Sequence, residues 1–228
     1  MKPLTTHHTY LDNFLLGILA GLAIGLGGFL NLVLKANNGE IFVFLGGIVF
    51  SIGLFTVCFF GLHLYTGRIG YVRDNERKYG LSLFIMFLGN MIGAVGFGYL
   101  LRLTGITDGY LKDIAPLVAS SKVIGETGQS ALKMIIYSFF CGIMVFLAVD
   151  IYKKSKNWVF KIGGLVTCVA LFVITGMEHC IADMFYFAIN NSYSDFLPAF
   201  FAIVLATAGN SLGAIASREV VRNIERNK

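Results

Sequence analysis

Six apolar segments, most of them as long as a helix that crosses a bilayer, dominate this sequence of 228 residues. A helix spans the hydrocarbon core with about 20 mostly apolar residues. The segments cover residues 14–34, 41–65, 81–101, 134–151, 162–189 and 196–216. Only 14% of the residues are charged, compared with about a quarter in soluble domains. We therefore predict an all-α integral membrane protein with six transmembrane helices, in which residues 1–228 form a single domain.

The charged residues lie mainly in the connections between these segments. Of the 18 Lys and Arg residues, 13 fall on one side of the expected topology. The other side receives Lys35, Arg102, Lys112, Lys122 and Lys133. The positive-inside rule then predicts that both termini are cytoplasmic. No basic run is interleaved with aromatic residues, so the net charge of +5 does not indicate a nucleic-acid partner.

A sequence motif recurs in the two halves of the chain. Gly89-Asn90-Met91-Ile92-Gly93-Ala94 in the third segment returns as Gly209-Asn210-Ser211-Leu212-Gly213-Ala214 in the sixth. Each half holds three segments, so the second copy must enter the membrane from the opposite side. We predict an inverted repeat with halves at about 12–103 and 129–217.

The second and fifth segments are long, and each carries polar residues after a glycine. Gly61 precedes His63 in one half, and Gly176 precedes Glu178 and His179 in the other. Inverted-repeat transporters place their substrate route near the midplane, at helices that are broken there. We expect the two helix breaks and their packing contacts at Gly61, Gly176, Asn90 and Asn210.

Ionisable groups inside a membrane segment mark a functional site by default. Glu178, His179 and Asp183 meet this criterion, and His63 and Thr66 belong with them. For Glu178 alone, a structural role in binding free backbone amides at the helix break is the competing interpretation. His179 is interpreted as functional.

The polar residues do not form a recognisable metal site or enzyme active site. His179 and Asp183 share a helical face, but two ligands are too few. The four cysteines lie in apolar stretches without ligand spacing, and no nucleophile is spaced to pair with a base. We therefore expect no metal, no cofactor and no enzymatic activity.

The segment Gly176-Met177-Glu178-His179-Cys180-Ile181-Ala182-Asp183-Met184-Phe185 resembles the G-x-E-H-S-I-A-N-M-F signature of the formate/nitrite transporter family. Gly61-Leu62-His63-Leu64-Tyr65-Thr66-Gly67 is similar to the family's G-x-E-L-F-T-G, and Gly209-Asn210 to its last-helix motif. The resemblance implies an aquaporin-like fold in the inner membrane of a bacterial cell. It also implies a homopentamer in which each protomer has its own route for formate, nitrite or hydrosulfide.

The resemblance also implies roles for individual residues. His179 would be the central pore histidine, and Thr66 would lie opposite it on the broken second helix. Glu178 and His63 would join them in the pore or in proton transfer. The apolar constriction would comprise Leu64 and Phe172, with weaker correspondence for Phe50, Leu54 and Tyr65. Without the resemblance, the sequence favours Phe172 as a lipid-facing or core aromatic residue.

This chain departs from the family pattern at several positions. His63 stands where the family has Glu, Asp183 where it has Asn, and Cys180 where it has Ser. The family also places a pore-directed lysine before the fourth helix. Counting back from His179 without gaps gives Glu126, whereas Lys122 requires a shift of four residues. We expect Lys122 to attract anions if that shift is real.

The expected function is a channel for formate-type or nitrite-type weak-acid anions, in which the central histidine gives pH-dependent or proton-linked permeation. A hydrosulfide channel on the same fold is the main alternative. A membrane scaffold without a pore and an intramembrane enzyme are further alternatives from other classes. The long connection over residues 104–128 is expected to carry short helices.

Overall fold

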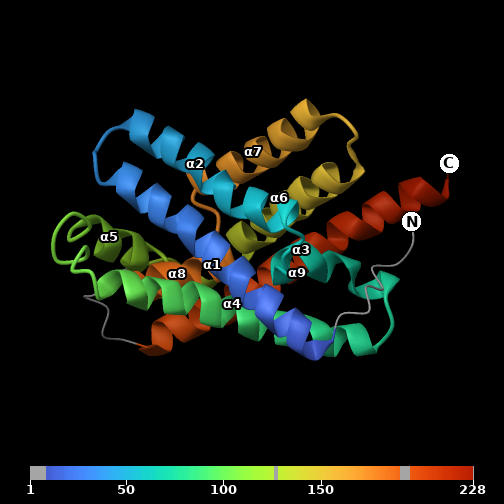
Figure 1. Ribbon diagram of the computed structural model, residues 1–228, viewed down its shortest axis with the longest axis horizontal. Helices are drawn as coiled ribbons and strands as arrows, with labels where there is room; N and C mark the ends of the chain where they lie inside the picture. Colours follow the sequence, from blue (N-terminus) through green and yellow to red (C-terminus); the bar gives the residue numbers. More distant parts are fainter. Residues whose placement is uncertain (1–8, 126–127, 191–195, 228) are drawn as a thin grey trace.

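The computed structural model describes residues 9–125, 128–190 and 196–227. The regular elements in these ranges are all helices (Figure 1). Five helices are long and apolar enough to cross a membrane: α1 (Tyr10–Lys35), α2 (Glu40–Phe59), α4 (Lys78–Arg102), α6 (Ala131–Lys154) and α9 (Phe196–Arg226). The expected fifth span is divided between α7 (Trp158–Ile174) and α8 (Cys180–Ile189). Shorter elements are α3 (Tyr65–Arg68), the 3-10 helix η1 (Ile69–Asp74) and α5 (Ile114–Ser121).

The helices form two equivalent groups. In the first half, α1 packs against both α4 and α2; in the second half, α6 packs against both α9 and α7. The two halves also meet where α2 packs against α7 and where α4 packs against α8. Figure 1 shows the start of α1 and the end of α9 on the same side of the molecule, as an even number of crossings requires. The predicted inverted repeat of three plus three spans is confirmed.

The second and fifth spans are broken, as the sequence predicted. The second span stops being helical at Phe59 and resumes at Tyr65, and the fifth stops at Ile174 and resumes at Cys180. Each break contains a glycine in the left-handed region, with φ of 68° at Gly61 and 71° at Gly176. Glycine adopts this conformation at little cost, whereas residues with a Cβ do so rarely. The two breaks therefore contain a glycine in the same backbone conformation.

Close helix crossings within each half depend on glycine. A Cβ atom built on Gly21 of α1 would lie 2.0 Å from the carbonyl oxygen of Asn90. A Cβ atom built on Gly142 of α6 would lie 2.2 Å from the carbonyl oxygen of Asn210. Small residues at such crossings let two backbones approach within a membrane. Both crossings bring a helix with a GNxxGA motif against the first helix of its own half.

The two sides of the molecule differ in charge. On one side, Arg218 Nε lies 2.6 Å from Asp74 Oδ2, and Lys154 Nζ lies 2.7 Å from Glu225 Oε1. Arg218 and Lys154 are two of the 13 basic residues that the positive-inside rule assigns to the cytoplasmic side. On the other side, Lys35, Lys122 and Lys133 line one cavity. The helix expected in the connection before α6 is α5, which ends one residue before Lys122.

Candidate functional site

Two buried asparagines join the helix breaks to the rest of the fold. Asn90 of α4 donates from Nδ2 to the carbonyl oxygen of His63 and accepts from the backbone N–H of Tyr65, both at 2.8 Å. Asn210 of α9 donates to the carbonyl oxygen of Glu178 at 2.8 Å and accepts from the N–H of Cys180 at 2.9 Å. Buried backbone groups that no helix satisfies are costly in a membrane. Each asparagine thus supplies the partners that one break lacks.

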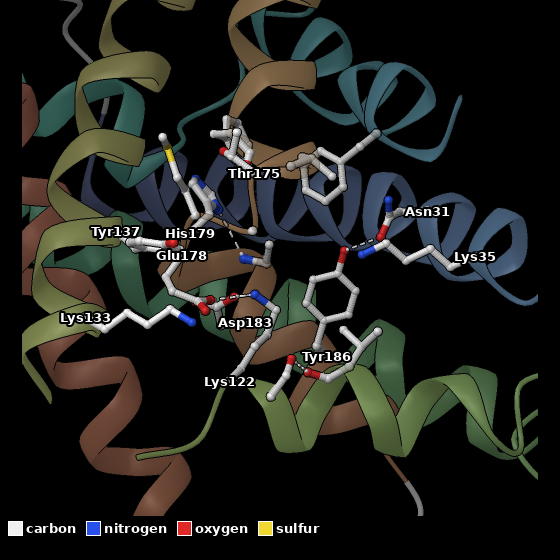
Figure 2. Close-up of a pocket in the computed structure, with 18 residues that line it drawn as sticks. Asn31, Lys35, Lys122, Lys133, Tyr137, Thr175, Glu178, His179, Asp183 and Tyr186 are labelled. Carbon is white, nitrogen blue, oxygen red and sulfur yellow. Dashed lines mark hydrogen bonds and ion pairs between the residues drawn. The ribbon is translucent and has the colours of Figure 1, made fainter. Parts of the chain in front are cut away.

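Beside the second break lies a cavity of about 270 Å³ (Figure 2). Its walls come from α1, α2, α5, α6, α7, α8 and the break between α7 and α8, with Lys122 entering from the connection after α5. Of the two further lysines in the wall, Lys35 is half-buried and Lys133 is exposed. Deeper in the cavity are Phe50, Phe172, Glu178, His179, Asp183 and Tyr186.

His179 is both the N-cap of α8 and a member of the cavity wall. Its Nδ1 accepts a hydrogen bond from the backbone N–H of Ala182 at 3.2 Å, and its Nε2 lies 2.8 Å from Thr66 Oγ1. A ring nitrogen that accepts from an N–H carries no proton. The proton of the neutral ring is therefore assigned to Nε2, which donates to Thr66. Thr66 keeps its hydroxyl proton for another acceptor.

Aromatic and leucine side chains surround this pair. The Phe172 ring stacks on the His179 ring with centroids 5.9 Å apart, and Phe50 packs edge-on against Phe172 at 5.8 Å. Leu54 and Leu64 are almost fully buried. Leu64, two residues before Thr66, lines a second and smaller cavity of about 60 Å³ together with Arg68 and Lys153. The Thr66–His179 pair and its apolar neighbours thus lie between two cavities that both contain cationic side chains.

Lys122 reaches the polar residues of the second break. Its Nζ lies 2.5 Å from Glu178 Oε2 and 2.9 Å from Asp183 Oδ1 (Figure 2). Glu178 Oε1 accepts a further hydrogen bond from Gln129 Nε2 at 2.6 Å. Burial alone would lower the pKa of Lys122, but the carboxylates of Asp183 and Glu178 outweigh it and raise this pKa above its ordinary value. Lys122 is therefore a permanent cation at neutral pH.

The remaining residues predicted for the site lie elsewhere. His63 is fully buried, with Nδ1 2.9 Å from Asn13 Oδ1 on α1. The hydroxyl of Tyr65 lies 2.9 Å from Ser211 Oγ on α9. Neither residue lines the two cavities described above. Their predicted roles in the pore stay predictions.

The sequence did not reveal several members of the site. Gln129 follows an irregular connection, and nothing in its surroundings identified it as the partner of Glu178. Tyr186 donates from its hydroxyl to Asn31 Oδ1 at 3.1 Å, which joins α8 to α1 across the cavity. Lys122, which gap-free counting did not favour, contacts Glu178, whereas Glu126 lies outside the described residues.

Within the described ranges, no three His, Cys, Asp or Glu side chains are grouped to hold a metal ion. The four cysteines are free thiols, two of them buried. The polar groups of the site can offer hydrogen bonds and charge to a small solute.

Comparison with known sequences finds one family across nearly the whole chain. A profile described as "Formate/nitrite transporter" matches residues 5–221. The chain is 23% identical to the formate channel FocB of Escherichia coli, over 92% of this chain and 78% of that protein. It is 28% identical to the formate channel BtFdhC of Bacillus thuringiensis, over 86% and 82% of the two chains. It is 30% identical to the uncharacterised transporter YrhG of Bacillus subtilis, over 75% and 67%.

Solved structures share the fold. An FNT family ion channel superposes with a TM-score of 0.78 at 22% identity, over 95% of this chain and 89% of that one. A pentameric formate channel with formate bound superposes with a TM-score of 0.75 at 24% identity, over 95% and 96%. At these identities the likeness concerns the arrangement of the helices.

Proposed function

The chain belongs to the formate/nitrite transporter family, and on this premise we propose that it is a membrane channel for small monovalent weak-acid anions, with formate as the leading candidate. Two relatives that cover most of the chain are formate channels. Because both relatives are channels, transport is favoured over an enzymatic function.

The observation that carries the proposal is the hydrogen bond between Thr66 and His179. It joins the two broken helices at 2.8 Å, and it lies between a cavity lined by Lys122 and one lined by Arg68. A solute that passes from one cavity to the other meets this pair. Broken helices at the midplane are where transporters of inverted repeat place their substrate route.

The chemistry of the pair suits a small anion. An anion without partners is strongly penalised in the membrane interior. The hydroxyl proton of Thr66 can donate to the anion and replace part of its water, and the Nε2 proton of His179 becomes a second donor when it turns from Thr66 to the anion. Phe172 and Leu64 provide an apolar surround that excludes further water, as in other selective pores. His179 acts here as a neutral donor, since a proton on Nδ1 would displace the N–H of Ala182.

We also propose that the protein acts as a homopentamer in the inner membrane with both termini in the cytoplasm. One relative of known structure is a pentameric formate channel. The exposed side chains of α1 form an apolar stripe at helical spacing, which could face lipid or a neighbouring protomer; they are Leu11, Leu15, Leu19 and Leu22. Native mass spectrometry in detergent should give a mass of five chains, and a monomer would contradict this assembly.

Flux into proteoliposomes tests the channel. Formate, nitrite and hydrosulfide are compared in liposomes with and without the wild-type protein. The informative variant is His179→Asn, because asparagine is a good N-cap and can still accept from Ala182. We expect this variant to fold like the wild type and to reduce formate flux about tenfold or more. A reduction of this size corresponds to the loss of roughly one hydrogen bond to a charged group.

His179→Ala is the matched comparison, because it removes the cap as well as the pore contact. No flux of any of the three anions from folded wild-type protein would contradict the channel function. Wild-type flux in His179→Asn would contradict the role of the histidine.

A further inference from the structure

Two carboxyl groups share one cation in the larger cavity. Glu178 and Asp183 both form ion pairs with Lys122, at 2.5 and 2.9 Å. Their exposed fractions are 3% and 2%. Within the parts of the chain that the structure describes, no other Lys or Arg forms an ion pair with either group. With both acids ionised, this cluster would carry one uncompensated negative charge inside the protein.

The two carboxyl groups differ in their hydrogen bonds. Both oxygens of Glu178 have donors, namely Lys122 and Gln129. Asp183 Oδ2 is buried without a hydrogen-bond donor among the described residues. A buried carboxylate oxygen without donors is costly, and two neighbouring carboxylates avoid ionising together. Asp183 lies in the first turn of α8, where the helix dipole favours negative charge, but this effect is small beside the desolvation of a buried ion.

Other charged and titratable groups surround the cluster from each packed element. Lys35 of α1 is half-buried and interacts with Lys122 and Glu178 at longer range, whereas Lys133 of α6 is exposed, so that water screens its charge. Neither lysine forms an ion pair with Glu178 or Asp183. Cys141 of α6 and Cys180 of α8 are buried thiols close enough to interact with Asp183. From the described parts of α4 and α9, no charged side chain lines the cavity. The groups that do line it are Lys35, Lys122, Lys133, Tyr137, His179 and Tyr186.

We infer that Glu178 and Asp183 together hold one proton at neutral pH, and that this proton couples anion entry to proton binding. The coupling rests on the proposed channel function. With the proton bound, the cluster with Lys122 is electrically neutral, and an arriving anion is the first excess charge. When the carboxyl O–H bond breaks and the proton passes to water, the cluster becomes negative and opposes the anion. Because binding linkage is reciprocal, an anion in the cavity also strengthens proton binding.

Infrared spectroscopy of the purified full-length protein tests for the proton without any transport assay. A protonated carboxyl group has a C=O stretching band that a carboxylate lacks. We expect this band in the wild type at neutral pH. Asp183→Asn and Glu178→Gln should each abolish the contribution of the pair, because either substitution leaves one carboxylate for one ammonium. Lys122→Met should strengthen it, because two acids then lack their cation.

The control is Asp150→Asn. Asp150 is also buried, but it accepts from Tyr71 and pairs with Lys154 on the other side of the molecule. This variant should keep the band. No carboxylic acid band in the folded wild type, or a band that survives both Asp183→Asn and Glu178→Gln, would overturn the shared proton.

Formate flux tests the coupling. After subtraction of the flux into empty liposomes, wild-type flux should fall about tenfold for each pH unit above the titration of the pair. Asp183→Asn should remove most of this fall and keep flux high at alkaline pH. A wild-type pH profile in Asp183→Asn would overturn the coupling. A different outcome is possible: the band is lost in Asp183→Asn and Glu178→Gln, but the wild type carries no anion flux. That result would support the shared proton and overturn the channel function.

Discussion

Asn90 and Asn210 make the same three hydrogen bonds in opposite halves of the molecule. Each accepts from the first backbone N–H after a helix break and donates to the carbonyl oxygen two residues earlier. Each also donates to the first helix of its own half, at Gly17 or at Ser138. One side chain therefore fixes three backbone segments at once.

Asn210→Asp tests this arrangement. The substitution preserves size and the acceptor oxygen but replaces the donor nitrogen with an oxygen that faces two carbonyl groups. Each buried group left without a partner costs about 1–3 kcal/mol, so the thermal midpoint in detergent should fall by several degrees. Asn157→Asp is the matched control, because Asn157 is an exposed N-cap where aspartate serves equally well. Equal midpoints for the two variants would contradict the bridging role.

The helix crossing at Gly93 predicts a second difference. A Cβ atom on Gly93 of α4 would lie 2.0 Å from the carbonyl oxygen of Ile18, a backbone atom that can move only with its helix. Gly96, one turn further along α4, has nothing within 4 Å of such an atom. We expect Gly93→Ala to lower the thermal midpoint and Gly96→Ala to leave it unchanged or raise it slightly, because alanine favours the helix. Similar midpoints would show that α1 and α4 are not held at this distance.

Phe172 separates Phe50 from His179 and is expected to limit the size of the permeating anion. Phe172→Leu reduces the volume of the side chain while keeping it apolar. Flux of acetate relative to formate should rise about tenfold or more, because the smaller side chain no longer excludes the extra methyl group, a discrimination worth roughly 1–3 kcal/mol. Phe200→Leu, at an exposed position of α9, is the control. An unchanged ratio in Phe172→Leu would place the limiting point elsewhere.

The raised pKa of Lys122 predicts how its ion pairs depend on pH. The folded protein binds the lysine proton more tightly than the unfolded chain does. The stabilisation by these pairs is therefore complete below about pH 10, the ordinary value for lysine, and is lost only as the pH rises through the higher folded value. Lys122→Met should lower the thermal midpoint at pH 7 and pH 9 alike. A difference from the wild type that already vanishes by pH 9 would contradict the raised pKa.

The repeated motifs were sufficient to predict the inverted repeat and both helix breaks. The reason is physical: Gly61 and Gly176 adopt a backbone conformation that other residues avoid, and Asn90 and Asn210 satisfy the groups that such a conformation exposes. Features of this kind require particular residue types at fixed spacing. They are therefore visible in a single sequence.

The partners of Glu178 were not visible in the same way. Lys122 and Gln129 lie in the connection between the halves, where neither helical periodicity nor the repeat fixes the position of a side chain. When such a segment is aligned with the family, a shift of four residues decides whether Lys122 or Glu126 occupies the position of the family's lysine. The placement of His63 against Asn13 was missed for a related reason, because the repeat identifies equivalent backbone positions and leaves side-chain direction open.

The connection that carries Lys122 lies outside the two repeated units. The helices are related by a pseudo-two-fold axis, but this lysine has no counterpart in the second half. A symmetric frame therefore holds an asymmetric electric field, with a cluster of one ammonium and two carboxyl groups in one cavity and Arg68 and Lys153 in the other. An ion that enters from one face meets a different potential from an ion that enters from the other. For the proposed channel we therefore expect rectification, in which anion gradients of equal size and opposite direction drive unequal currents.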